Sequence, residues 1–317
     1  MPAVLFSSMN STIGRSMKML STRARLQVGA IVAPERAVAD AVRLFLTPPR
    51  RLIRDRDRVF LAGGEGFVVA VGEARLSAWR FGPRDRPAVI LSHGWGGRGA
   101  QFHAFVPALI DAGFQAVVFD HAGHGLSEGR QSSLIDFGRG LGAVANALTL
   151  RGIRIAGVVG HSLGAAAIAP FLRASNRSVR SVLVAPPASL VGYSAWFARK
   201  LGLGEKLRSR LQSVVEGRYG VRWDELELPA SVASLASPAL VIHDENDSDV
   251  RISAGLAIAR AWPGARFVRT RGLGHTAILR DAGVVRDAID FLKGEVVFAR
   301  PPAAGEWSAF PGPAPLI

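Results

Sequence analysis

Short apolar runs alternate with longer helical stretches from residue 88 onward, and this alternation restricts the fold more than any other feature of the chain. The apolar runs are rich in valine, isoleucine and leucine and occupy residues 88–93, 116–121, 155–162, 181–187, 239–247 and 266–270. Near-continuous apolar strands joined by helices are typical of a parallel sheet that is covered on both faces. We therefore predict an α/β fold with a mostly parallel central sheet.

The remaining segments divide the chain into parts. Residues 34–46 have apolar side chains at helical spacing after an initial proline, which predicts an amphipathic helix. Residues 67–71 and 76–81 read as an antiparallel hairpin at a sheet edge. We expect an N-terminal extension with one amphipathic helix, an α/β core in two pieces, a small helical insertion and a disordered proline-rich tail, spanning 1–60, 61–187 with 238–298, 188–237 and 299–317.

The insertion at 188–237 interrupts the alternation of strands and helices and is rich in aromatic residues. Its position after a predicted strand suggests a lid over the carboxyl edge of the sheet. We expect Tyr193 and Trp196, together with Trp95, to contact an apolar part of a substrate.

Composition excludes several chemistries and partners. The 317 residues are 49% hydrophobic, which is enough for one large core, and they include no cysteine. Disulfides, thiolate catalysis and cysteine-ligated zinc are therefore excluded. The formal net charge is +14, but nearly all of the 39 basic side chains are arginines, scattered along the chain without an accompanying basic-aromatic motif. We expect no nucleic-acid partner.

Two apolar segments bear on localisation. In residues 1–20 the basic side chains follow the short apolar run, which is the wrong order for a secretory signal. Residues 155–172 carry no formal charge, but their glycines and Pro170 favour a strand plus helix over a membrane span. We expect a cytoplasmic protein without a transmembrane segment, and the sequence leaves peripheral membrane association and the oligomeric state open.

The pentapeptide GHSLG at 160–164 makes Ser162 a candidate nucleophile. It fits the G-x-S-x-G pattern, whose glycines allow a sharp turn between a strand and a helix and expose the serine Oγ. Residues 125–129 match the same pattern. However, Ser127 follows a glycine- and histidine-rich stretch and precedes polar residues, so neither a strand nor a helix abuts it. We interpret Ser127 as a loop residue.

A serine nucleophile needs a base and an acid that orients the base. Asp247 closes the run at 239–247, and His275 follows the run at 266–270, so the chain order is Ser, Asp, His. Polar residues at the carboxyl ends of parallel strands gather at one edge of the sheet. Asp244 and Asp249 flank Asp247 and remain alternative acids, although Asp244 reads more readily as a turn residue.

Five motifs along the chain carry a family resemblance. They are HGWGG at 93–97, DHAGHGLSEG at 120–129, GHSLGA at 160–165, HDENDSDV at 243–250 and GLGH at 272–275. With these motifs, residues 67–293 resemble the serine esterases and lipases of the α/β-hydrolase superfamily. The resemblance implies that Ser162 is the nucleophile, His275 the base and Asp247 its orienting acid. It further implies an oxyanion hole formed by the backbone N–H groups of Trp95 and Leu163.

The resemblance implies a cofactor-independent hydrolase of the carboxylesterase or lipase type, acting on a small acyl or ester substrate. Relatives that use an aspartate nucleophile, the haloalkane dehalogenases and epoxide hydrolases, are excluded by the serine. Thioesterase, acyltransferase, perhydrolase and C–C hydrolase activities stay open, as does a non-catalytic ligand-binding role.

Several histidines lie near the predicted site without metal-binding spacing. No H-x-H or H-E-x-x-H motif with acidic partners occurs among them, so we expect no metal and interpret them as turn and packing residues: His93, His121, His124 and His161. His103 reads as a structural residue at the start of a helix.

Overall fold

The structure is a computed structural model that describes residues 20–50, 52–175 and 177–294. Residues 1–19 and the predicted proline-rich tail at 299–317 lie outside this part of the chain. Within it, none of the helices combines the length and the apolar character that a membrane crossing requires.

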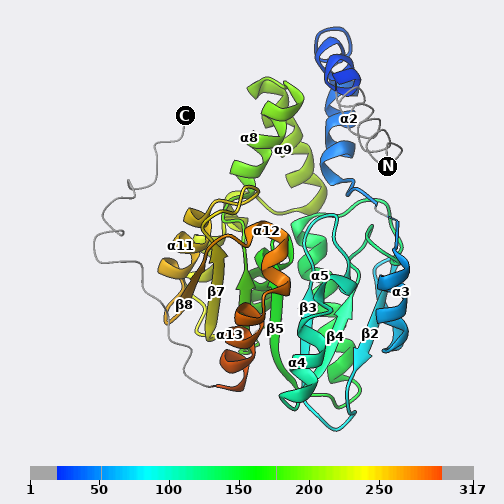
Figure 1. The fold of residues 1–317 in the computed structure, drawn as a ribbon. Coiled ribbons are helices and arrows are strands. Elements are labelled where there is room, and N and C mark those ends of the chain that lie inside the picture. The colour runs from blue at the N-terminus through cyan, green and yellow to red at the C-terminus, as the bar shows by residue number, and fades with distance from the viewer. Residues whose placement is uncertain (1–19, 51, 176, 295–317) are drawn as a thin grey trace, which may run out of the picture. The chain divides into compact units, whose positions relative to one another are not determined.

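An eight-stranded sheet forms the centre of the fold, with strand order β1-β2-β4-β3-β5-β6-β7-β8 (Figure 1). Strands β1 and β2 form an antiparallel hairpin, β2 is antiparallel to β4, and all the other neighbours are parallel. The strands are β1 (Glu65–Val71), β2 (Ala74–Phe81), β3 (Ala88–Ser92), β4 (Gln115–Phe119), β5 (Ile155–His161), β6 (Arg180–Val184), β7 (Ala239–Asp244) and β8 (Arg266–Thr270). The predicted parallel sheet with an edge hairpin is confirmed.

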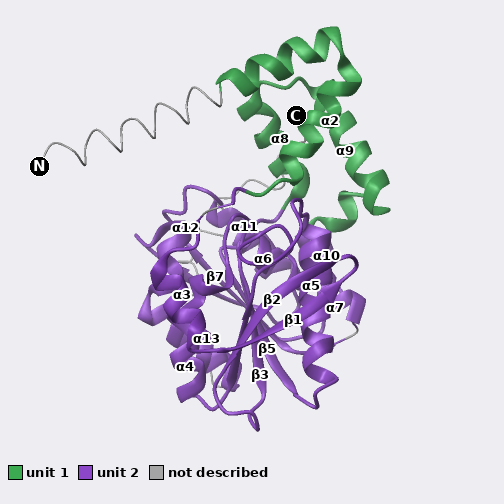
Figure 2. Cartoon of the chain, turned by 90° about the vertical axis from the view of Figure 1, so that its right-hand side faces the viewer, with its two compact units in different colours: residues 1–48, 189–227 green, residues 49–188, 228–317 purple. Residues whose placement is uncertain are grey.

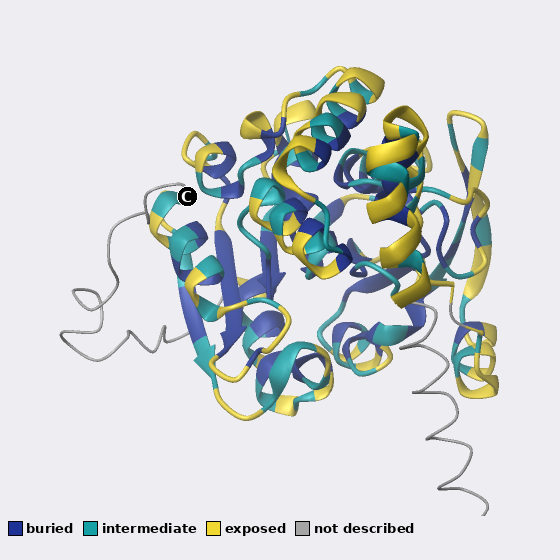
Figure 3. Cartoon of the chain, turned by 90° about the horizontal axis from the view of Figure 1, so that it is seen from above, coloured by how far each residue is buried: buried dark blue, intermediate teal, exposed yellow. Residues whose placement is uncertain are grey.

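Helices cover both faces of the sheet (Figure 2). One face carries α3 (Asp55–Ala62), α4 (Phe105–Asp111) and α13 (Ala282–Lys293), and the other carries α5 (Leu134–Thr149), α7 (Ile168–Ser175), α10 (Leu228–Val232) and α11 (Ile252–Ala261). Short helical turns η1 (Gly99–Phe102), α6 (Leu163–Ala166), α12 (Gly274–Ala277) and η3 (Ile278–Arg280) lie in the connections. Every residue of β3, β4 and β7 is buried, and the buried strands of the sheet are dark blue in Figure 3.

The helix that the sequence predicted within residues 155–172 is divided into α6 and α7. Pro170 is the third residue of α7, where its missing N–H costs nothing because the first turn of a helix has no internal acceptor for it. The proline would remove a hydrogen bond from one continuous helix. The break at Ala167 therefore follows from the same residue that argued against a membrane span.

The chain divides into two compact units, and they are coloured separately in Figure 2. The larger unit holds the sheet and consists of residues 49–188 and 228–317, and the smaller one of residues 1–48 and 189–227. In the larger unit, α10 packs against α7 and α11. Residues 228–237, which we had assigned to the insertion, thus belong with the sheet.

The smaller unit is helical and has its own aromatic cluster. Residues 20–32 are helical and are followed by α2 (Pro34–Leu46), α8 (Leu190–Leu201), α9 (Glu205–Tyr219) and η2 (Asp224–Leu226). The Phe45 ring of α2 lies 5.2 Å from that of Phe197 and 5.5 Å from that of Trp223, measured between centroids. Aromatic contacts of this kind, with an ion pair between Glu35 and Arg210, join α2 to the insertion.

Candidate active site

Ser162 lies in a sharp turn between β5 and α6. Its φ of 53° and ψ of −123° are unusual for a residue with a side chain, and such strain persists only where the surroundings enforce it. Both glycines of the pentapeptide lie so close to neighbouring backbone that a side chain at either position would clash. A Cβ on Gly160 would lie 2.5 Å from Ala165 Cα, and one on Gly164 would lie 2.3 Å from the Ser92 carbonyl oxygen. The sequence therefore folds here into the strand–turn–helix of a nucleophile elbow.

Asp247 and His275 meet at the carboxyl ends of β7 and β8. The His275 Nδ1–H donates to Asp247 Oδ2 over 2.7 Å. The other carboxylate oxygen accepts the backbone N–H groups of Asp249 at 2.9 Å and Val250 at 2.8 Å. The Asp247 side chain is fully buried, so it is held in one orientation while His275 remains partly exposed.

The charge on Asp247 is stabilised in spite of its burial. Burial acts to raise the pKa of this carboxyl, but hydrogen bonds from His243 and His275 and from the Val250 N–H outweigh it and keep the pKa below its usual range. The carboxylate is therefore ionised at neutral pH. This is the state that can fix the imidazole tautomer and stabilise an imidazolium.

The alternative acids have different positions. Asp244 accepts hydrogen bonds from Thr270 Oγ1 at 2.8 Å and from the N–H groups of Leu273 and Gly274 at 3.1 and 3.0 Å. It thus ties the end of β7 to the loop before His275 and is a turn residue. The Asp249 side chain is exposed. Of the three carboxylates, only Asp247 bonds to His275 in the described part of the chain.

Ser162 and His275 belong to neighbouring loops, but no hydrogen bond joins their side chains among the described residues. Their connection runs through His161, whose Nε2–H donates to the His275 carbonyl oxygen over 2.7 Å. Serine–histidine contacts are often loose in unliganded enzymes and tighten when substrate binds. From the sequence we interpreted His161 as a turn and packing residue, and no motif indicated its bond to the His275 carbonyl.

The backbone N–H groups of Leu163 and Trp95 are the predicted donors of an oxyanion hole. Neither donates a hydrogen bond to another group in residues 20–50, 52–175 and 177–294. Leu163 begins α6, directly after the elbow. Trp95 follows Gly94, where a Cβ would lie 2.9 Å from Ser162 Cβ, so the glycine lets the two loops approach each other. The Trp95 ring lies 6.4 Å from that of Phe137 and 5.4 Å from that of His124.

The histidines beside the site pack against one another and against Phe137. His121 stacks on Phe137 with ring centroids 3.7 Å apart, and the His93 Nε2 accepts the His121 N–H over 3.0 Å. Burial lowers the pKa of His93 and His121 well below the usual range and that of His124 to about 4. These rings are therefore neutral at pH 7. No group of three metal-ligating side chains occurs in the described residues.

Ser127, in the second pentapeptide, is a buried loop residue, as the sequence predicted. Its hydroxyl donates to the Asp120 carbonyl oxygen over 2.5 Å and accepts the Ser77 N–H over 2.9 Å. The Asp120 carboxylate accepts the N–H groups of Gly99 and Leu126, both over 2.7 Å. Asp120 thereby holds together the segment after HGWGG and the loop that contains Ser127.

Tyr193 and Trp196 both lie in α8 of the smaller unit. Their rings stack with centroids 5.6 Å apart, and Lys200 Nζ lies 4.6 Å above the Trp196 ring. Tyr193 also contacts Phe45. Their contact with a substrate stays a prediction, as does that of Trp95.

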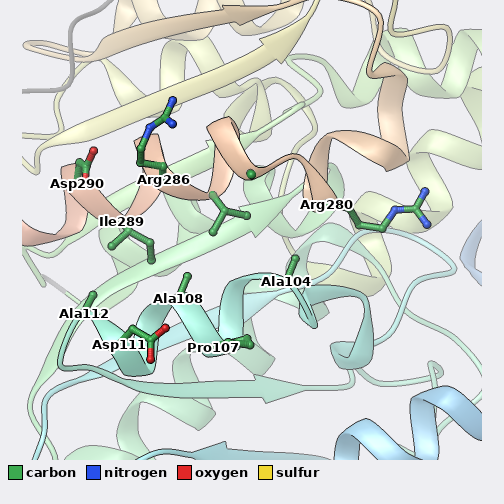
Figure 4. A pocket seen from close by; sticks show the side chains of 11 residues that line it. Ala104, Pro107, Ala108, Asp111, Ala112, Arg280, Arg286, Ile289 and Asp290 are labelled. Atoms are coloured by element: carbon green, nitrogen blue, oxygen red, sulfur yellow. The ribbon is translucent and has the colours of Figure 1, made fainter.

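A surface hollow between α4 and α13 is separate from these residues (Figure 4). Alanines and the side chains of Asp111, Arg286, Ile289 and Asp290 line it. None of the predicted site residues is among them. The hollow lies beside helices that cover the sheet.

The fold and the elbow define an α/β-hydrolase. A sequence model of the family described as serine aminopeptidase, S33, matches residues 83–287, and the chain belongs to this family. An uncharacterized protein of Mycobacterium tuberculosis, Rv2307c, is 31% identical over 296 residues, covering 83% of this chain and 93% of that one.

Solved structures show the same fold at low sequence identity. The carboxylesterase CesB of Bacillus subtilis is 21% identical, with a TM-score of 0.55 over 76% of this chain and 97% of its own. The esterase Pf2001 of Pyrococcus furiosus is 19% identical, with a TM-score of 0.59 over 78% and 99%. The predicted membership of the α/β-hydrolase superfamily is confirmed.

Proposed function

We propose that the protein is a serine hydrolase that cleaves a carboxylic ester or a related acyl compound through an acyl-enzyme. The observation that carries the proposal is the 2.7 Å bond from His275 Nδ1 to Asp247 Oδ2, beside the elbow that bears Ser162. A nucleophile, a base and an orienting acid from three separate strand ends are the parts that acyl transfer requires.

In the proposed reaction, Ser162 Oγ attacks the carbonyl carbon and its proton passes to His275 Nε2. The carbonyl oxygen becomes an oxyanion that accepts the N–H groups of Leu163 and Trp95. When the bond to the leaving alcohol breaks, His275 returns the proton to the alcohol oxygen. Water then attacks the carbonyl carbon of the acyl-enzyme and gives a proton to His275. When the bond to Ser162 Oγ breaks, His275 returns that proton to Oγ and the acid is released.

Asp247 contributes by keeping the Nδ1 proton of His275 in place. With Nδ1 protonated and bonded, Nε2 presents a lone pair toward the nucleophile. The ionised carboxylate also stabilises the positive charge that His275 carries after the first proton transfer.

The same machinery supports thioesterase, acyltransferase, perhydrolase and C–C hydrolase reactions, which differ in the acyl donor or acceptor. A non-catalytic ligand-binding protein of this fold is the alternative from another class. The lid role of the insertion, and substrate contacts by Trp95, Tyr193 and Trp196, belong to the proposal as well.

Labelling with a fluorophosphonate probe tests the proposed nucleophile. We expect covalent modification of the peptide that contains Ser162 and of no other serine, identified by mass spectrometry. A wild-type protein that stays unlabelled and inactive would support the ligand-binding alternative. A matched pair of variants tests the acid. Asp247→Asn should lower kcat about 10⁴-fold because the imidazole takes the wrong tautomer. Asp249→Asn changes an exposed side chain and should leave kcat near the wild-type value.

A panel of acyl compounds tests the substrate class. p-Nitrophenyl esters of increasing chain length, acyl-CoA thioesters, lactones and an amino-acid p-nitroanilide separate ester, thioester and peptide chemistry. A maximum at one chain length would support a size-selective lid. Equal rates at all chain lengths would argue against it.

A further inference from the structure

His161, the residue before the proposed nucleophile, makes two hydrogen bonds that fix its protonation. Its Nε2 faces the His275 carbonyl oxygen at 2.7 Å, and its Nδ1 faces the side-chain nitrogen of Gln101 at 3.2 Å. A carbonyl oxygen can only accept, so Nε2 carries the proton and Nδ1 accepts from the Gln101 amide. One ring therefore bonds to residues that lie 114 and 60 positions away in the chain.

These bonds join three loops of the larger unit. His161 ends β5 and leads into the elbow, Gln101 lies in η1 after residues 94–97, the proposed oxyanion loop, and His275 lies in α12. The glycines of the oxyanion loop make room for this contact. A Cβ on Gly94 would lie 3.3 Å from His161 Nδ1, and a Cβ on Gly97 would lie 2.5 Å from Gln101 Oε1.

The surroundings keep His161 neutral. Burial above all, and then the neighbouring His275, lower its pKa to about 3, against the opposing effects of the His275 carbonyl and Asp247. His243 is a further neighbouring imidazole that lowers the pKa of His161. The rings of His161 and His275 lie 4.8 Å apart between centroids. A charged His161 would repel the imidazolium that His275 becomes during the proposed reaction.

We propose that His161 is a positioning residue that fastens the backbone of His275 to the nucleophile elbow, and that Gln101 holds its ring in the required tautomer. This inference rests on the proposed function, because it assigns His161 to the alignment of that base with Ser162. Asp247 fixes the His275 ring through Nδ1, whereas His161 fixes the backbone from which the ring projects. The two contacts together leave the base little freedom relative to the serine.

The test compares His161→Leu with His161→Gln. Leucine fills the buried space without a donor, whereas the glutamine amide can place an N–H near the position of Nε2. We expect His161→Leu to lower kcat by about 10- to 100-fold with KM unchanged, because a displacement near 1 Å costs up to about 100-fold. We expect His161→Gln to retain a substantial part of the kcat that His161→Leu loses. Wild-type kcat in His161→Leu would overturn the proposal, and so would equal losses in the two variants.

Further variants separate positioning from folding. If His161→Leu does not fold, Gln101→Leu leaves the imidazole in place and removes only the donor to Nδ1, and we expect a smaller loss of kcat with the same thermal midpoint. An unchanged kcat in Gln101→Leu would then count against the proposal. His103→Gln, at an exposed histidine two positions after Gln101, is the control and should behave like wild type.

Nuclear magnetic resonance of ¹⁵N-histidine-labelled protein gives a readout that needs no turnover. We expect the His161 ring to remain neutral with Nε2 protonated at pH 5, and the low-field proton of the His275–Asp247 bond to shift or broaden in His161→Leu. Titration of His161 near pH 6.5, or an unchanged low-field proton, would refute the inference. A wild-type protein that is inert to the probe and to esters, yet shows these resonances, would refute the proposed function and leave the positioning contact standing.

Discussion

Residues 160–164 and 125–129 share the G-x-S-x-G pattern, but their serines have opposite surroundings. Ser162 occupies a strained backbone conformation, and its hydroxyl makes no hydrogen bond within the described residues. Ser127 is buried, and its hydroxyl both donates to Asp120 and accepts from Ser77. A hydroxyl with both bonding directions occupied serves the loop, whereas one without partners is available for chemistry.

The glycines of the two pentapeptides also differ in purpose. Gly160 and Gly164 allow the close packing of strand, turn and helix. Gly125 adopts a φ of 48°, and a Cβ there would lie 1.9 Å from Asp120 Oδ2, so it allows the loop to close around that carboxylate. The comparison teaches that the pattern identifies a sharp turn. The strand before it and the helix after it are what make Ser162 the proposed nucleophile.

The largest expected difference between the two serines is in catalysis. Ser162→Ala should lower kcat/KM by roughly 10⁴- to 10⁶-fold, because the variant lacks the nucleophile. Ser127→Ala should stay within a few-fold of wild type because its hydroxyl contacts no reacting group, while losing about 1–3 kcal/mol of stability. Steady-state kinetics and chemical denaturation of both variants measure this. A large kinetic loss in Ser127→Ala would mean that the second pentapeptide also takes part in the reaction.

Adding one methyl group at the glycines should have the next largest effect. In Gly164→Ala the new Cβ meets the carbonyl oxygens of Ser92 and His93 at 2.3 and 2.4 Å, and neither backbone can move away easily. We expect losses of roughly 3 kcal/mol or more in Gly164→Ala and Gly125→Ala, from overpacking. Gly217→Ala is the control, since it lies in α9 with nothing within 4 Å and should gain about 0.5 kcal/mol. Thermal and urea unfolding report these values, and near-wild-type stability of Gly164→Ala would contradict the close packing.

The loop of the second pentapeptide should carry a pH signature that the elbow lacks. Burial raises the pKa of Asp120 to about 6, against the opposing N–H groups of Leu126 and Gly99. Between about pH 4 and pH 6 the folded chain thus retains a proton that the unfolded chain has released, so the free energy of unfolding falls as the pH rises through this window. Asp120→Asn should lack this fall of about 1–3 kcal/mol. Parallel curves of unfolding free energy against pH for the two proteins would disprove the assignment.

The smallest effect concerns the strain at Ser162. Ser162→Gly removes the hydroxyl together with the steric cost of its φ of 53°, so this inactive variant should be about 1 kcal/mol more stable than wild type. Differential scanning calorimetry measures the shift, with Ser162→Ala as the matched variant that keeps a Cβ. Equal midpoints for the glycine and alanine variants would show that the elbow stores no strain.

Periodicity predicted most of the sheet. The predicted run at 266–270 coincides with β8, and the other predicted runs differ from the observed strands mainly at their carboxyl ends. At these ends the predicted runs continue past the last paired residue of the strand and include residues of the candidate site, such as Asp247. Buried parallel strands are identifiable because each is a continuous apolar run, whereas the short helix α3, with few buried residues, was missed.

The proposed triad follows from motifs and chain order, but its supporting contacts do not. The bond between His161 and the His275 carbonyl joins residues that are 114 positions apart, and its acceptor is a backbone atom, which leaves no mark on residue types. Asp120 is similar, because its partners are the N–H groups of Gly99 and Leu126. Side-chain-to-backbone contacts of this kind become visible only when the chain is folded.

The proposed triad and the inserted segment follow different strands of the sheet. Ser162 follows β5, Asp247 follows β7 and His275 follows β8. Strand β6, which lies between β5 and β7 in the sheet, contributes no residue to the proposed triad. It is after β6 that residues 189–227 of the smaller unit are inserted. Evolution could therefore lengthen, exchange or delete this segment without altering any of the three residues. The proposed lid role predicts that chimeras with another relative's segment at this junction change selectivity while keeping the same chemical step.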